Sequence, residues 1–340
     1  MASPRAVVFG CSGPVLLDSE RSFFQDADPL GFILFARNCQ TPGQVRALVK
    51  DLRAAVGRDD APILIDQEGG RVARLTPPHW RTAPAPARFN DLARLDREKA
   101  EEASRLNARL LAHELSDLGI TVDCAPVLDL PQKGADPIIG DRAAGDSPEL
   151  AALLGGAACE GFLAGGVIPV LKHIPGHGRA RADSHKELPV VDAPLEDLER
   201  VDFAPFKALH AMPWAMTAHI VYKALDPDRP ATVSKTVIEE TVRDRIGFGG
   251  VLISDDLGMK ALGGPLCERA GAALGAGCDL ALHCNGSMQE MEEVADACPS
   301  LGAGALSRIE RAERMRTMKK TDFEPKEAVL RLDTLLAELK

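Results

Sequence analysis

The chain has 340 residues, 45% of them hydrophobic and 26% charged, which is the composition of a folded globular protein. Forty basic against fifty acidic residues give a formal net charge of −10, which argues against a nucleic-acid partner because neutralising phosphates needs a basic face. No apolar run reaches the length of a membrane span or of a signal-peptide core, so we expect a cytoplasmic protein without membrane contact.

Eight short apolar runs recur along the chain, and each is followed by turn-forming residues and then by a more polar stretch. Their apolar residues are nearly continuous instead of alternating, which is typical of strands that are covered on both faces. In chain order, the predicted strands are 6–9, 31–35, 62–66, 121–127, 167–173, 214–220, 249–254 and 278–284.

Helical patterns separate most of these runs. The stretch 97–118 shows the period best, because Ala103, Leu106 and Leu110 fall on one stripe while charged residues cover the rest. The predicted helices are 42–56, 97–118, 147–164, 195–209, 235–245 and 267–274.

Eight strands that alternate with helices over this length favour an α/β fold, a (β/α)8 TIM barrel, over a doubly wound open sheet. No composition break is long enough for a linker between domains. We therefore expect residues 1–340 to form a single barrel domain, with a helical tail from about residue 305 on the side of the barrel. The eight cysteines are scattered without a CxxC pair, which predicts buried small apolar side chains rather than disulfides or zinc ligands.

Polar residues stand where several predicted strands end, and in such barrels these ends form the active-site mouth. Three chemistries are open for the stretch 172–189, "KHIPGHGRARADSHKELP". A metal site is one, with the ligands His173, His177, Asp183 and His185, but the two histidines of "HIPGH" flank a Pro-Gly turn instead of sharing one helix face. A Schiff-base role for Lys172 is the second, although no glycine-rich phosphate loop follows late in the chain.

Glycoside hydrolysis is the third reading, because a retaining glycosidase needs a carboxylate nucleophile and a group that gives and recovers a proton. The predicted strand in "VLISDDLGM" stops at Asp255 and Asp256, of which the first suits delivery to the mouth and the second a helix cap. The i, i+2 spacing of Asp183 and His185 lets the carboxylate hold the imidazole tautomer.

Four sequence motifs resemble those of the single-domain bacterial β-N-acetylglucosaminidases of glycoside hydrolase family 3. They are "LIDQEGGRVARL" (64–75), "KHIPGHG" (172–178), "DSH" followed by "LP" (183–189) and "SDDLGM" (254–259). The shorter stretches "GFILFARN" (31–38), "APVLDL" (125–130), "GDR" (140–142) and "TAHI" (217–220) fit the same family. The resemblance runs in order from near residue 10 to about 290, and the specificity lies in the ordered set.

The resemblance implies that Asp255 is the nucleophile and His185 the general acid/base, with Asp183 as its orienting partner on a mobile loop. It assigns sugar binding to Asp66, Arg74, Arg142, Lys172 and His173. It also implies a small-molecule substrate, a terminal β-linked N-acetylglucosamine on anhydro-N-acetylmuramic acid peptides from cytoplasmic peptidoglycan recycling, and neither metal nor organic cofactor. We expect a monomer. A metal-dependent barrel hydrolase and a non-catalytic sugar-binding sensor on the same barrel remain the alternatives.

Overall fold

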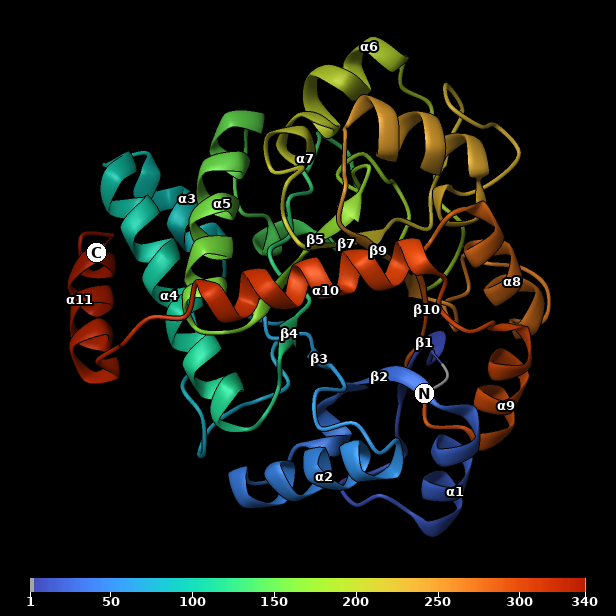
Figure 1. Ribbon diagram of the computed structural model, residues 1–340. Helices are drawn as coiled ribbons and strands as arrows, with labels where there is room; N and C mark the ends of the chain where they lie inside the picture. Colours follow the sequence, from blue (N-terminus) through green and yellow to red (C-terminus); the bar gives the residue numbers. More distant parts are fainter. Residues whose placement is uncertain (1–2, 340) are drawn as a thin grey trace.

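Eight parallel strands close into a barrel in the computed structural model, which describes residues 3–339 (Figure 1). They follow the order β1-β10-β9-β7-β5-β4-β3-β2, and β1 pairs with both β10 and β2, which closes the ring. The strands are β1 (Arg5–Gly10), β2 (Pro29–Leu34), β3 (Ile63–Ile65), β4 (Val122–Asp123), β5 (Ile168–Ile174), β7 (Trp214–Thr217), β9 (Val251–Asp256) and β10 (Leu280–His283). The predicted α/β fold, a TIM barrel, is confirmed, and each predicted strand overlaps an observed one. A separate parallel pair joins β6 (Val190–Val191) to β8 (Val221–Tyr222).

The strands are buried on both faces, which explains why their sequences are continuously apolar. On the inside, residues such as Val8, Leu64 and Trp214 form one core cluster. Their neighbours in sequence, such as Val7 and Ile63, point outward and pack in a second cluster with the surrounding helices. Successive side chains of each strand therefore point alternately into two apolar clusters, not into one apolar and one polar environment.

The helices around the barrel are α1 (Asp18–Ala27), α2 (Pro42–Ala55), α3 (Ala87–Ala93), α4 (Arg97–Asp117), α5 (Pro148–Ala164), α6 (Leu195–Asp197), α7 (Ala204–Ala208), α8 (Leu266–Ala276) and α9 (Met288–Ala297). Short 3-10 turns are η1 (Ala36–Asn38), η2 (Gly140–Arg142) and η4 (Ala231–Val233), and π-helical segments are η3 (Leu198–Asp202) and η5 (Val237–Arg245). Side-chain oxygens of Thr41, Asp96 and Ser147 accept hydrogen bonds from backbone N–H groups and so cap α2, α4 and α5.

The predicted helix over 195–209 is divided in the structure into α6, the π-helical η3 and α7. Pro205 lies at the start of α7, where its missing N–H costs no hydrogen bond, whereas a continuous helix would have placed it inside. The division brings Asp202, the last residue of η3, into a buried position.

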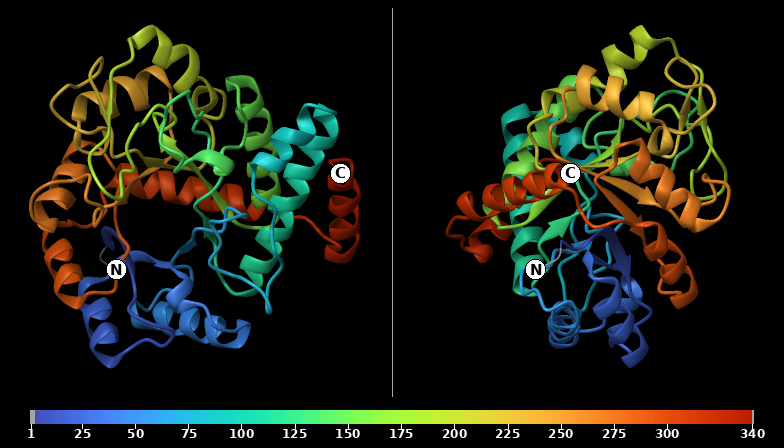
Figure 2. Two further views of the ribbon diagram at one scale, coloured as in Figure 1. Left: turned by 180° about the vertical axis from the view of Figure 1, so that it is seen from behind. Right: turned by 45° about the vertical axis from the view of Figure 1, so that its right-hand side comes forward.

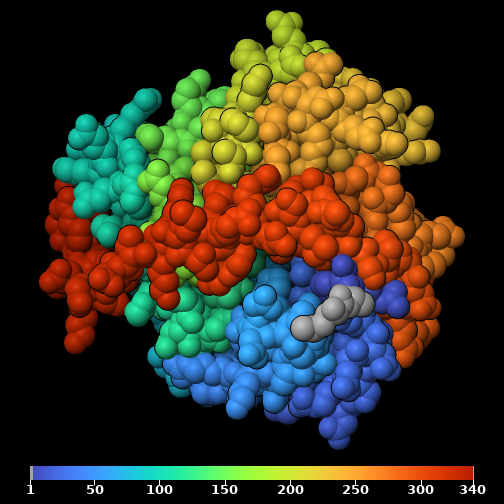
Figure 3. Space-filling view, viewed as in Figure 1, coloured from blue at the N-terminus to red at the C-terminus, as the bar shows by residue number. Residues whose placement is uncertain are grey.

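The helical tail predicted from about residue 305 follows α9 and is not one continuous helix. Two helices form instead, α10 (Ala303–Met318) and α11 (Pro325–Ala337). Figure 1 shows α10 crossing in front of the strands, and in Figure 3 it forms the orange-red band across the middle of the face. Leu306, Ile309 and Ala312 on one side of α10 pack against the inner barrel core, so this helix closes the amino-terminal end of the barrel.

The second helix, α11, lies beside α4 in both views of the molecule (Figures 1 and 2). Leu332 and Leu335 share a small cluster with Leu92 and Leu110, and this apolar seam holds α11 there. No disulfide joins the eight cysteines, all of which lie in the described part of the chain and most of which are buried. Within residues 3–339, no helix has the length and the apolar character to cross a membrane.

Candidate active site

A cavity of about 330 Å³ opens at the carboxyl ends of the barrel strands. All of the predicted site residues except Asp183 line this cavity, and Asp183 contacts one of those that do. The lining residues are Ile33, Phe35, Asp66, Glu68, Arg71, Val72, Arg74, Ile138, Arg142, Lys172, His173, His185, Met216, Asp255, Asp256, Met259, Leu282 and Cys284. The barrel thus brings together polar side chains that are almost 190 residues apart in sequence, from Asp66 to Asp255.

One wall of the cavity is a network of buried charges around Lys172, at the end of β5. Its Nζ atom lies 2.9 Å from Asp66 Oδ1 and 2.8 Å from Glu68 Oε1. Burial opposes ionisation of all three groups, but their mutual attraction raises the pKa of Lys172 and lowers the pKa of both carboxyl groups. Arg74 NH2 adds a second contact to Asp66 at 3.0 Å. The wall therefore presents fixed charges that can bind hydroxyl groups of a ligand.

Glu68 is a site residue that the sequence analysis missed. Its two carboxylate oxygens accept hydrogen bonds at 2.8 and 2.9 Å from the guanidinium group of Arg142, whose side chain is 9% exposed. Glu68, together with the carbonyl oxygen of Ile138, thus holds the Arg142 side chain at the cavity. The only signal was the position of Glu68 inside "LIDQEGGRVARL", since it stands three residues beyond the end of β3.

His173 is oriented by Asp129, a second residue that the sequence did not single out. Asp129 Oδ2 lies 2.7 Å from His173 Nδ1, and Asp129 Oδ1 accepts a hydrogen bond of 2.6 Å from the backbone N–H of His177. These hydrogen bonds, together with the adjacent histidines, lower the pKa of the carboxyl group against the effect of its burial. One buried carboxylate thus fixes both the ring of His173 and the start of the following loop.

Asp255 is the penultimate residue of β9, and it lines the cavity. Burial raises its pKa, but the nearby His173 and His219 imidazoles and the backbone N–H of Asp256 outweigh that effect and lower it. His219 is itself held, with Nδ1 2.7 Å from Thr232 Oγ1 and Nε2 3.0 Å from the carbonyl oxygen of Asp256. The arrangement keeps an ionised carboxylate at the cavity, as an attacking nucleophile requires.

His185 reaches the same cavity from the loop 176–189, which is defined here as the catalytic loop. Its ring is 61% exposed, and its Nδ1 atom lies 2.9 Å from Asp183 Oδ1. Burial raises the pKa of Asp183, but hydrogen bonds from His185 and Lys186 lower it below the ordinary value. Because Asp183 occupies Nδ1, Nε2 is the ring nitrogen left to exchange a proton with a ligand.

His177 behaves differently from its neighbours in the stretch 172–189. Its Nε2 atom lies 3.1 Å from Ser184 Oγ inside the catalytic loop, and burial lowers its pKa to about 4. A neutral imidazole in this place ties the two halves of the loop together. Among residues 3–339, no group of three or more His, Cys, Asp or Glu side chains has a geometry that could hold a metal ion.

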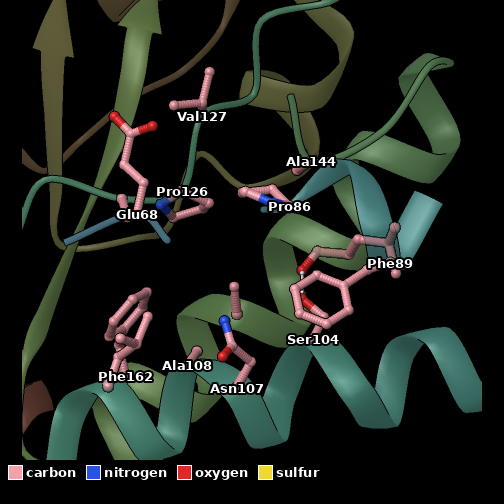
Figure 4. A pocket seen from close by; sticks show the side chains of 14 residues that line it. Glu68, Pro86, Phe89, Ser104, Asn107, Ala108, Pro126, Val127, Ala144 and Phe162 are labelled. Atoms are coloured by element: carbon pink, nitrogen blue, oxygen red, sulfur yellow. Dashed lines mark hydrogen bonds between the residues drawn. The ribbon is translucent and has the colours of Figure 1, made fainter. Parts of the chain in front are cut away.

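A second cavity lies behind Glu68, between α4, α5 and the chain after β4 (Figure 4). It measures about 30 Å³, which is room for about one water molecule and not for a sugar. In Figure 4 the carboxylate of Glu68 points away from Asn107 and Ser104, and its partners are Arg142 and Lys172. The ligand site is therefore the larger cavity at the strand ends.

Residues 18–317 match the protein family described as "Glycosyl hydrolase family 3 N terminal domain". The chain therefore belongs to glycosyl hydrolase family 3, and it is a glycoside hydrolase. A β-hexosaminidase of Alkalilimnicola ehrlichii is 41% identical over 283 residues, which are 82% of this chain and 80% of the relative. A β-hexosaminidase of Pseudomonas aeruginosa is 37% identical over 319 residues, 92% of this chain and 90% of the relative.

Solved structures agree with these relatives. NagZ from Neisseria gonorrhoeae, in complex with N-trifluoroacetyl-D-glucosamine, has a TM-score of 0.87 at 32% identity and covers 98% of this chain and 99% of its own. A β-N-acetylhexosaminidase from Beutenbergia cavernae has a TM-score of 0.74 at 26% identity, with 92% of this chain and 95% of that one covered. The resemblance that the motifs predicted, to single-domain β-N-acetylhexosaminidases of family 3, is confirmed.

Proposed function

We propose that this protein is a retaining exo-β-N-acetylglucosaminidase that removes terminal N-acetylglucosamine from anhydro-N-acetylmuramic acid peptides. The observation that carries the proposal is that a carboxylate suited to nucleophilic attack and a histidine suited to proton transfer line the same cavity. An ionised carboxylate, Asp255, stands near the carboxyl end of β9 there, and an Asp183–His185 pair approaches from a loop. The solved relative from Neisseria gonorrhoeae, which holds an N-acylated glucosamine, supports the choice of sugar.

The proposed reaction has two steps. The carboxylate of Asp255 attacks the anomeric carbon, and the C–O bond to the leaving group breaks as His185 donates its proton to the departing oxygen. His185, now neutral, then takes a proton from water, whose oxygen attacks the anomeric carbon and releases Asp255. Asp183 stabilises the imidazolium form of His185 and keeps Nε2 available in both steps.

The charged wall of the cavity suits the binding of a single sugar. Asp66 accepts hydrogen bonds from sugar hydroxyls, while Lys172 and the two arginines, Arg74 and Arg142, donate them; His173 stands beside the nucleophile. A volume of about 330 Å³ lies at the low end of the roughly 300–1,000 Å³ of ligand pockets, which favours one terminal residue over an internal chain segment. No residue in this scheme needs a metal or an organic cofactor.

The first experiment is release of nitrophenol from 4-nitrophenyl N-acetyl-β-glucosaminide by the purified protein with EDTA present. We expect turnover by the wild type and none by Asp255→Ala at an unchanged melting temperature. Loss of the wild-type activity in EDTA, restored by zinc, would favour the metal-dependent hydrolase. Tight sugar binding without turnover by a folded wild type would favour the sugar-binding sensor.

The natural substrate needs a separate measurement. The recycling role, the cytoplasmic location and the monomeric state are part of the proposal. We expect purified muropeptides to lose one N-acetylglucosamine each when digested, as seen by mass spectrometry, with the anhydro-N-acetylmuramic acid peptide left intact. Cleavage of aryl glycosides alone, with no effect on muropeptides, would refute the proposed substrate. Light scattering of the protein as it elutes from a sizing column gives its molar mass and so tests the monomeric state.

A further inference from the structure

The catalytic loop has an anchored half and an exposed half. In residues 176–180, the carbonyl oxygens of Gly176, Gly178 and Ala180 accept hydrogen bonds from Tyr222 Oη, Gln132 N and Asp136 N at 2.7–2.9 Å. Beyond Ala180 the chain is mostly exposed until Leu188, with Ser184 as the buried exception. The proposed acid/base His185 thus sits on the half that has few contacts of its own, and its position depends on the anchored half.

Arg179 is the only charged side chain in that anchored half. Its Nε atom lies 2.6 Å from Asp202 Oδ2, and the Asp202 side chain is 1% exposed at the end of η3. Asp202 Oδ1 is also buried and has no hydrogen-bond partner among the described residues. Burial raises the pKa of Asp202 to about 6, against the attraction of Arg179. A buried carboxylate with so few partners is costly to keep, so a pure packing role would be better served by an apolar residue.

The backbone beside this ion pair is equally close-fitting. A Cβ atom on Gly176 would lie 2.9 Å from the Cβ atom of Asp202, so the root of the loop rests directly on this residue. A Cβ atom on Gly178 would lie 1.9 Å from the carbonyl oxygen of Leu130, which fixes the next turn of the loop on its other side. Asp202 therefore lies against the loop at Gly176 and pairs with it at Arg179, seven and four residues before Asp183.

We propose that Asp202 is a positioning residue for the acid/base step: through Arg179 it holds the first half of the catalytic loop so that Asp183 and His185 reach the cavity. This inference rests on the proposed function of His185 and goes beyond it, because Asp202 lines no part of the cavity. Its effect must therefore pass through the loop and not through contact with the sugar.

The test compares kcat/KM for a phenyl and a 2,4-dinitrophenyl N-acetyl-β-glucosaminide, which differ in how much the departing oxygen needs a proton. We expect Asp202→Asn to lower kcat/KM about tenfold on the phenyl substrate and much less on the dinitrophenyl one, because misplacing a catalytic group slows only the step that it serves. Arg179→Met should behave in the same way, and Arg179→Lys should recover part of the loss. Arg181→Met, which removes an equal charge from the exposed half, is the matched control and should match the wild type.

The decisive measurement repeats Asp202→Asn and Arg179→Met in a His185→Ala background. If Asp202 acts through His185, neither substitution lowers kcat/KM further there. The inference is overturned if kcat/KM falls equally on both substrates. It is also overturned if Asp202→Asn lowers kcat/KM as much in the His185→Ala background as in the wild type, because either result shows a merely structural role. Should Asp202→Asn fail to fold, the Arg179 variants carry the same comparison. If His185→Ala itself shows no preference between the two leaving groups, the proposed acid/base role fails instead.

Discussion

Asp255 and Asp256 are neighbours in sequence whose carboxyl groups have opposite surroundings. Asp256 Oδ1 accepts hydrogen bonds of 3.0 Å from the backbone N–H groups of Gly258 and Cys284. Asp255 accepts one, from the backbone N–H of Asp256 at 2.8 Å. The carboxylate of Asp256 is used in the turn after β9 and at its junction with β10, whereas the carboxylate of Asp255 keeps free lone pairs at the cavity.

This difference predicts opposite results for substitution of the two residues. Asp255→Ala should lose at least about 10³-fold in kcat with an unchanged melting temperature, because it removes the proposed nucleophile and no structural acceptor. Asp256→Ala should instead destabilise the fold by about 1–3 kcal/mol, since the N–H of Cys284 loses its partner. Chemical denaturation and initial rates measure both; an unstable Asp255→Ala would contradict the assignment.

The ion pair between Glu68 and Arg142 predicts a large effect on stability. Glu68→Ala leaves the buried charge of Arg142 without its carboxylate partner and leaves Lys172 with Asp66 alone, so we expect a loss of about 3–5 kcal/mol in the free energy of unfolding and a raised KM. Asp141→Asn is the control, because it removes a pair with Arg71 in which both side chains are more than 40% exposed, worth about 1 kcal/mol or less. A Glu68→Ala protein as stable as the control would refute the role of the network.

The lowered pKa of Asp255 predicts where activity is lost in acid. The nucleophile must be ionised, so kcat/KM falls as the pH drops through its pKa, which lies below the ordinary value of 3.8. His173→Gln removes a charge that favours the ionised form and should move this acid limb to higher pH. His210→Gln, at an exposed histidine, should leave it in place. If the acid limb does not move in His173→Gln, the electrostatic effect of His173 on Asp255 is contradicted. Circular dichroism at each pH checks that the proteins remain folded.

Asp123 predicts a pH dependence of stability that is separate from catalysis. Burial raises its pKa to about 8, although the backbone N–H of Gln67 and the charge of Lys172 oppose the shift. The folded state therefore binds a proton that the unfolded state releases near pH 3.8, and the stabilising contribution falls with rising pH until it is lost above about pH 8. Asp123→Asn should flatten this decline between pH 6 and 9 in urea unfolding; an equal decline in both proteins would refute it.

The strands were predictable because a barrel strand is buried on both faces and its sequence is a continuous apolar run. Asp66, Lys172 and Asp255 were predictable for the same reason, since each stands at or next to the end of such a run. Glu68 and Asp129 were not, because their roles come from partners more than 40 residues away. Local sequence carries no information on those pairings.

Two helices show the same limit. The predicted stretch 195–209 was correct in extent, but the structure divides it into α6, η3 and α7, and the partner of the buried Asp202 is Arg179, 23 residues earlier in the chain. The apolar residues of α10 are few and lie among many charges, a pattern that a solvated surface helix would show as well. Only the closed barrel supplies the apolar surface that those residues cover.

The helix α10 also has a consequence for how the molecule is made. It follows the last strand in the chain, so all eight strands leave the ribosome before the helix that seals the bottom of their interior. Until residues 303–318 have emerged, the apolar surface that Leu306 and Ile309 cover remains exposed to water at the amino-terminal end of the nascent barrel. Chains shortened before Ala303 should consequently bind hydrophobic dyes and holding chaperones, even though they contain every residue that lines the cavity at the strand ends.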